Sequence, residues 1–110
     1  MGPFAKGDVI IASLNYSDFS GSKRRPALVV AAPDDLDPVL CLITSRIRDD
    51  GYDVTIRSED FASGGLNRDS TVRVCHLFSL DPSLIDYKAG VLRPAKIQEV
   101  TSGIVAMLTD

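Results

Sequence analysis

The sequence has few of the side chains that metal centres and histidine-based catalysis require. It contains two cysteines, Cys41 and Cys75, and one histidine, His76. These residues lack the paired ligand spacing of a zinc site, so the sequence predicts no metal and no cofactor. A two-imidazole acid–base pair is impossible within one chain, and no Gly-x-Ser-x-Gly elbow accompanies His76. A phosphate loop ending in Gly-Lys-Ser or Gly-Lys-Thr is also lacking.

Long apolar runs are missing as well. The longest, at 27–33 and 38–43, fall far short of the ~20 residues that cross a bilayer. The N-terminal residues do not form a charged-then-apolar signal segment. We therefore expect a cytoplasmic protein that does not enter a membrane. In that compartment Cys41 and Cys75, which lie in apolar segments, are expected to be buried reduced thiols.

The remaining composition is that of a folded protein. Of the 110 residues, 45% are hydrophobic and 25% are charged, which predicts one domain spanning 1–110 with its own core. The formal net charge of −3 argues against binding duplex nucleic acid over a whole face, although it leaves room for a small basic site.

Short apolar segments separated by turn-forming residues predict five or six strands. The predicted strands are 8–14, 26–32, 39–44, 52–57, 71–77 and 84–88, with turns at 17–22, 33–38 and 63–67. From Pro94 onward, apolar residues recur every three or four positions, which predicts a helix. Its expected apolar face is Ile97, Val100, Ile104, Met107 and Leu108, and Gly103 is expected to mark close packing. The sum is a small, mainly β barrel or curled sheet with a C-terminal helix.

Two groups of cations and hydroxyls stand where strands begin or end. Lys23, Arg24 and Arg25 precede Pro26, which holds Arg25 extended at the mouth of its strand. The stretch 44–48, Thr-Ser-Arg-Ile-Arg, closes another strand. By charge alone the first group would also suit a solvated loop end. Together, however, guanidiniums and hydroxyls indicate a phosphodiester site.

One strand carries two further candidates. Arg73 shares a face with Thr71 and Cys75, so it needs a partner or water and would line a pocket or an interface. His76 shares a face with the valines of that strand, so a histidine at the edge of the core is expected more than a catalytic one.

Four segments in this order resemble the MazF/PemK family of endoribonuclease toxins from type II toxin–antitoxin modules. They are Lys-Gly-Asp-Val-Ile-Ile at 6–11, Gly-Ser-Lys-Arg-Arg-Pro-Ala-Leu-Val-Val at 21–30, Leu-Ile-Thr-Ser at 42–45, and Gly-Leu-Asn-Arg-Asp-Ser-Thr-Val-Arg at 65–73. The resemblance spans nearly the whole chain.

The resemblance implies an SH3-like β-barrel with a C-terminal helix, which acts as a homodimer and cleaves single-stranded messenger RNA at short sequences without a metal. It implies catalytic roles for Arg25, Thr44 and Arg73. It also implies a MazE-like antitoxin as partner, with DNA contacted only through that antitoxin. The residues expected to bind RNA around the site are Phe19, Lys23, Arg24, Ser45, Arg46, Ser70 and His76.

The chain departs from the family pattern where a general base is expected. Family loops before Arg-Pro often carry Glu, Gln or His, whereas here the loop offers only Asp18. Some members place an acidic residue two positions after the second arginine, where this chain has Cys75. Proton transfer is therefore open between Asp18, Thr44 and the substrate itself. Two alternatives keep the fold: a non-nuclease toxin that binds a protein such as DNA gyrase, and a barrel that has lost catalysis.

Overall fold

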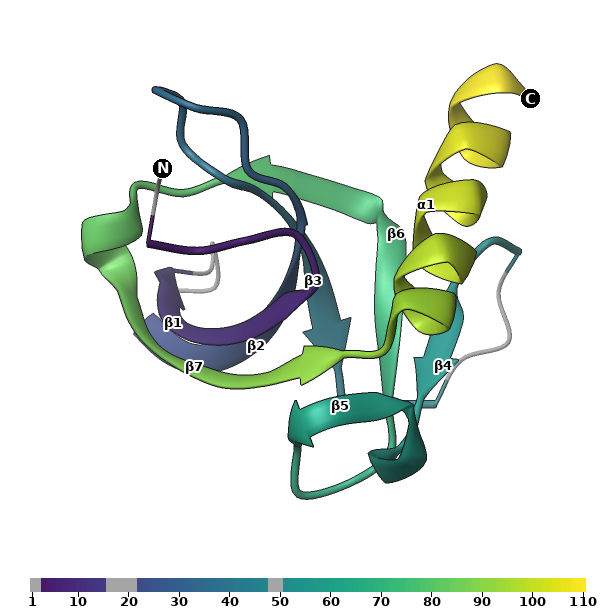
Figure 1. Ribbon diagram of the computed structural model, residues 1–110, viewed down its shortest axis with the longest axis horizontal. Helices are drawn as coiled ribbons and strands as arrows, with labels where there is room; N and C mark the ends of the chain where they lie inside the picture. The colour runs from purple at the N-terminus through teal and green to yellow at the C-terminus, as the bar shows by residue number, and fades with distance from the viewer. Residues whose placement is uncertain (1–2, 16–21, 48–50) are drawn as a thin grey trace.

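A curled antiparallel sheet and one C-terminal helix make up the molecule (Figure 1). The computed structural model describes residues 3–15, 22–47 and 51–110. The strands are β1 (Asp8–Asn15), β2 (Ser22–Ala31), β3 (Val39–Thr44), β4 (Val54–Ile56), β5 (Phe61–Gly64), β6 (Ser70–Ser79) and β7 (Ile85–Leu92), and the helix is α1 (Pro94–Thr109). Two 3-10 turns, Ser58–Asp60 and Pro82–Leu84, precede β5 and β7. The mainly β fold with a C-terminal helix is thus confirmed.

The strand order β4-β6-β3-β2-β1-β7-β5 places the central strands between two apolar clusters. In β1, Val9 belongs to the larger cluster and Ile10 to the smaller one on the other face. In β2, Leu28 and Val29 divide in the same way. This alternation follows from the period of two in a strand, and it explains why these segments are nearly all apolar.

Helix α1 covers the larger cluster beside β6 and β4, as Figure 1 shows. It begins with Pro94 in its first turn, where a missing N–H costs nothing. Val100 is buried, and Ile97, Ile104 and Met107 pack on the cluster as predicted. A Cβ on Gly103 would lie 3.1 Å from the carbonyl oxygen of Tyr52, so the predicted close packing is confirmed. In the described part of the chain, no helix is long and apolar enough to span a bilayer.

The expected apolar face of the helix was wrong at Leu108. Its side chain is 68% exposed, because it lies in the last turn, beyond the helical residues that pack on the cluster.

The region of β5 and β7 also differs from the prediction. Ser63 and Gly64 belong to β5 rather than to a turn, and β7 continues through Gly90 to Leu92. The glycines allow the two strands to approach closely: a Cβ on Gly90 would lie 2.6 Å from the Ser63 carbonyl oxygen. Glycine here marks close backbone packing, which its usual role in turns conceals.

Two expectations about side-chain burial on β6 were wrong. Cys41 is buried, but Cys75 is exposed. His76 is exposed too, although Val72 and Val74 on the same strand are buried. The cause is an irregularity in the β3–β6 ladder, where Cys41 pairs with Leu77 but Ile43 pairs with Val72. Extra residues on β6 interrupt the alternation of faces beyond Val74.

Candidate functional site

Strands β2 and β3 bring two of the predicted catalytic residues together. Thr44 is the last residue of β3. Arg25 was expected at the mouth of its strand, but β2 begins at Ser22, so Arg25 lies within it, opposite Ala12 of β1. Strands β2 and β3 are antiparallel, with Ala27 opposite Leu42. Continuing that register by two residues places Arg25 opposite Thr44. Pro26 disfavours a helical conformation for the residue before it, which suits Arg25 as a strand residue. The adjacency of the two motifs therefore follows from the pairing of their strands.

A polar pocket of 520 Å³ lies at this place. It is lined by Arg25, Thr44, Ser45, Arg46 and Arg68. The backbone N–H of Arg46 donates to Thr44 Oγ1 at 3.2 Å, which orients this hydroxyl while its own hydrogen can still be donated. The described lining holds three guanidiniums, two hydroxyls and no carboxylate. Guanidiniums stay charged and pair with phosphate through two hydrogen bonds, so this pocket has the chemistry of a phosphate site.

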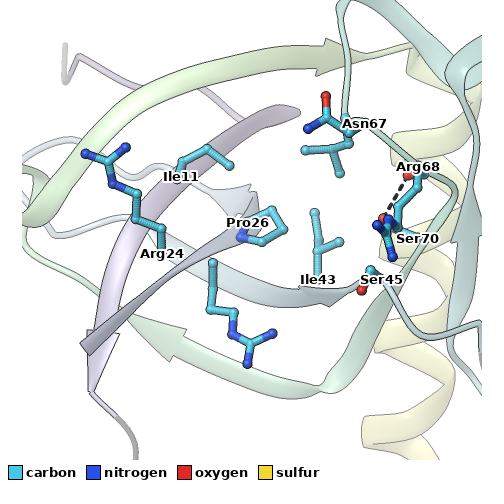
Figure 2. A pocket seen from close by; sticks show the side chains of 10 residues that line it. Ile11, Arg24, Pro26, Ile43, Ser45, Asn67, Arg68 and Ser70 are labelled. Carbon is cyan, nitrogen blue, oxygen red and sulfur yellow. Dashed lines mark hydrogen bonds between the residues drawn. The ribbon is translucent and has the colours of Figure 1, made fainter. Parts of the chain in front are cut away.

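A second pocket of 260 Å³ shares Arg25, Ser45 and Arg68 with the first. Figure 2 shows apolar side chains, Ile11, Pro26 and Ile43, between Arg24 on one side and Asn67, Arg68 and Ser70 on the other. Leu66 also lines it. An apolar surface bordered by an amide and cations suits a flat, polar-edged group such as a nucleobase.

The segment between β5 and β6 supplies a residue that the sequence analysis missed as a site residue, Arg68. The backbone N–H of Gly65 donates to the Ala89 carbonyl at 3.1 Å, which ties down the start of the segment. At its end, the buried hydroxyl of Ser70 donates to the Arg68 carbonyl at 3.0 Å (Figure 2). The Gly-Leu-x-x-Asp-Ser motif contains Arg68, but at a variable position, so the motif did not single this residue out.

The other basic residues of β2 lie at or beyond the edge of the site. Arg24 lines the second pocket, and its Nε lies 3.5 Å from Asp86 Oδ2 in an exposed ion pair. Lys23 is exposed and lines neither pocket.

Arg73 is placed differently from Arg25 and lines neither pocket. Its Nε lies 2.8 Å from Asp53 Oδ2, and the Asp53 side chain is only 4% exposed. Asp53 Oδ1 also accepts the Val74 backbone N–H at 3.2 Å, and Arg73 Nη2 lies 3.8 Å from the Cys75 sulfur. The expectation that Arg73 needs a partner is confirmed, and the partner is a carboxylate of this chain.

The remaining candidates lie apart from the pockets or outside the description. His76 lines neither pocket, and its ring makes an edge contact with Phe78 at a centroid distance of 6.3 Å. Phe19 and Asp18 fall outside the described residues. Among the described residues, no three His, Cys, Asp or Glu side chains are grouped to hold a metal ion.

One thiol near the Arg73 ion pair is perturbed. The pKa of Cys41 is raised from 9.0 to about 12, chiefly by burial and to a smaller extent by electrostatic repulsion from the neighbouring Cys75 and Asp53 side chains. Cys41 is therefore a neutral, inert core residue at physiological pH.

The comparisons with known proteins agree with the motifs. The family model described as the PemK-like, MazF-like toxin of type II toxin–antitoxin systems matches residues 5–108. The chain belongs to this family. The comparison with curated proteins gave no match.

Solved structures of toxins share the fold at low sequence identity. A mycobacterial endoribonuclease in complex with its cognate antitoxin is 18% identical, with 96% of this chain and 95% of that chain covered and a TM-score of 0.76. The MazE–MazF complex of Deinococcus radiodurans is 21% identical, with 99% and 98% covered and a TM-score of 0.76. The Mycobacterium tuberculosis toxin MazF-mt6 is 21% identical, with 93% and 96% covered and a TM-score of 0.73.

Proposed function

We propose that this toxin is a sequence-specific, metal-independent endoribonuclease that cleaves single-stranded RNA, chiefly messenger RNA, in the cytoplasm. The observation that carries the proposal is the polar pocket, where Arg25 and Thr44 meet with two further arginines. A toxin that only binds a protein has no need of a pocket with this charge and these donors. Fixed guanidiniums can supply the charge stabilisation that a metal ion provides in other nucleases.

The proposed reaction is an attack by a ribose 2′-hydroxyl on the adjacent phosphorus. The new bond joins O2′ to phosphorus, and the bond from phosphorus to O5′ breaks. The 2′-hydroxyl loses its proton and the leaving O5′ gains one, which yields a 2′,3′-cyclic phosphate and a 5′-hydroxyl end. Arg25 would stabilise the added negative charge on the phosphorane, a contribution of roughly 3–4 kcal/mol for one preorganised donor. Thr44 would donate to a non-bridging oxygen or relay the proton.

The acceptor of the 2′-hydroxyl proton is the open part of this mechanism. None of the described residues that line the two pockets is Asp, Glu, His or Cys. Asp18, Thr44 and the substrate itself remain the proposed routes. Arg73, which the family resemblance adds as a catalytic residue, lies outside both pockets, and its role in the reaction stays a prediction.

Sequence preference would come from bases splayed into the neighbouring pocket and onto loops. The second pocket offers the apolar lining for one base. Phe19 and the 33–38 loop are proposed to supply further surfaces, as single-stranded RNA is usually read. Lys23, Arg24 and Arg46 are proposed to position phosphates without reading bases. Ser45, Ser70 and His76 are proposed as further RNA contacts.

We propose a homodimer of about 24 kDa, twice the chain mass of 11.9 kDa. Exposed apolar side chains, among them Tyr87 and Val105, are the kind of surface that a second copy covers. A MazE-like antitoxin would place an acidic tail in the RNA site, so the two ligands would compete, and DNA would be reached only through the antitoxin. Light scattering that gives a monomer at micromolar concentration would refute the dimer, and simultaneous binding of RNA and antitoxin would refute the shared site.

The direct test is digestion of a long RNA by the purified protein in EDTA. We expect discrete fragments with 5′-hydroxyl and 2′,3′-cyclic phosphate ends. Loss of cutting in EDTA that magnesium or manganese restores would contradict the metal-independent mechanism. Intact RNA together with inhibited DNA gyrase supercoiling would indicate a protein-binding toxin, and intact RNA without inhibition would indicate a barrel that has lost catalysis.

A further inference from the structure

Two arginines of the Gly65–Arg73 segment could stabilise a phosphate beside Arg25, and the structure treats them differently. Arg73 is committed to Asp53, with its Nε at 2.8 Å from the nearer carboxylate oxygen. The Asp53 side chain is 4% exposed and that of Arg73 is 24% exposed, so the pair is largely shielded from water. Turning Arg73 toward a phosphate would leave a buried carboxylate without its countercharge, which is costly.

Arg68, unlike Arg73, lines the pockets and has no carboxylate partner among the described residues. It lines both pockets, alongside Arg25 and Ser45 in each. Within the described residues, no carboxylate forms an ion pair with it. Its neighbour Asp69 lies 3.3 Å from Arg57 in a separate, exposed pair.

The backbone around Arg68 is fixed, which gives its side chain a defined origin. The Ser70 hydroxyl, itself 3% exposed, holds the Arg68 carbonyl at 3.0 Å. The Gly65 N–H holds the other end of the segment on β7. A cation carried on an anchored segment loses less freedom on binding a phosphate than one on an unanchored loop.

We infer that Arg68 is the second phosphate-binding arginine of this toxin and that Arg73 is a positioning residue, which holds the residues before β4 against β6 through Asp53. The inference rests on the proposed endoribonuclease function. Arg25 and Arg68 approach one phosphate from β2 and from the β5–β6 segment, and Thr44 lines the same polar pocket. Because Arg68 lines both pockets, it would also fix the phosphate relative to the base in the second pocket.

The test compares single-turnover cleavage of one RNA oligonucleotide by Arg68→Ala, Arg68→Lys, Arg73→Lys and Arg57→Ala, with wild type and Arg25→Ala as references. We expect Arg68→Ala to lower the rate constant by ~100-fold or more, the usual loss for one transition-state donor. Arg68→Lys should recover part of it, because a point charge keeps the attraction but not the bidentate geometry. Arg57→Ala removes an exposed arginine from outside both pockets and should cut within about twofold of wild type.

Arg73→Lys keeps a cation opposite Asp53 and should cut within about threefold of wild type. Arg73→Ala should lower the melting temperature by on the order of 10 °C, whereas Arg68→Ala should leave it nearly unchanged. The comparison is made with Arg73→Lys because the alanine variant can lose activity simply by unfolding.

The two proposals fail in different ways. Wild-type protein that leaves the RNA intact would overturn the proposed function and this inference with it. A second result would overturn only the assignment of Arg68 and leave the proposed function intact. In that result wild type cleaves the RNA and Arg25→Ala does not, Arg68→Ala keeps more than about a third of the wild-type rate, and Arg73→Lys loses activity. A loss in Arg57→Ala as large as in Arg68→Ala would also overturn it, because the effect would then be one of general charge.

Discussion

Two regions of this toxin hold arginines in opposite electrostatic settings. In the polar pocket, Arg25, Arg46 and Arg68 meet with two hydroxyls and no carboxylate among the described lining residues. Along β6, Arg73 lies against a carboxylate that is almost wholly buried. Arginine side chains therefore have different roles in the two regions. The pocket presents positive charge to a ligand. The ion pair of Arg73 with Asp53, the β6 pair, instead joins two parts of the fold.

The difference shows what decides the role of a cation in a small protein. A guanidinium beside a fixed carboxylate contributes little field to its surroundings, because the two charges nearly cancel beyond their own separation. Several guanidiniums gathered in one pocket raise the local concentration of phosphate. Position in a motif does not distinguish these cases, since the deciding residue, Asp53, lies far from Arg73 in sequence.

The largest expected effect on stability comes from breaking the β6 pair. Asp53→Ala leaves Arg73 without its countercharge and should lower the free energy of unfolding by about 3–5 kcal/mol. Asp69→Ala removes an acidic residue from an exposed pair and should cost less than about 1 kcal/mol. Urea unfolding of both variants measures the difference, and equal losses would show that the Asp53–Arg73 pair is no more structural than a surface pair.

A smaller effect is expected from the hydroxyl at the pocket wall. Thr44→Val keeps the shape of the side chain but removes its donor, so cleavage should fall by about 10- to 100-fold, or ~1.4–2.7 kcal/mol. Thr109→Val, which removes an exposed hydroxyl at the far end of α1, is the matched control and should cut like wild type. If the two variants cut at equal rates, Thr44 does not take part in the reaction.

The two thiols near the β6 pair should differ in reactivity at pH 8. Cys75 is exposed and should be alkylated by iodoacetamide in the native protein, whereas Cys41 should react only in urea. Because the folded-state pKa of Cys41 is about 12, above its ordinary 9.0, this thiol stabilises the fold below pH 9, and that contribution is lost as the pH rises toward 12. Mass spectrometry that finds both thiols labelled in the native protein would contradict the buried position of Cys41.

Local sequence patterns predicted the strands that build the polar pocket. Most of the features that these patterns did not predict depend on the pairing of strands far apart in the sequence. Arg25 and Thr44 were predicted because each lies beside a strong apolar run with a recognisable motif. The pairing of Arg73 with Asp53 depends on β4 lying against β6, which no pattern in either segment specifies. The exposure of His76 depends on the irregular β3–β6 register, which is a property of two strands and not of one.

The wrong prediction of a turn at 63–67 is explained by glycine. The run Ser63-Gly64-Gly65 has the composition of a turn, yet its first two residues pair with β7. Their small size permits the close contact with Gly90, and the sequence does not distinguish that use from a turn. Arg68 was missed for a different reason, because it occupies a variable position in the segment that follows β5.

The most direct test of the account is single-turnover RNA cleavage by Arg25→Ala in EDTA, with its fold checked by circular dichroism and its melting temperature compared with that of wild type. Arg25 lines both pockets, so its removal should lower the cleavage rate by about 100- to 1,000-fold while the spectrum stays that of wild type. A folded variant that keeps more than about a tenth of wild-type activity, a loss below ~1.4 kcal/mol, would contradict the assignment of this pocket as the site of RNA cleavage.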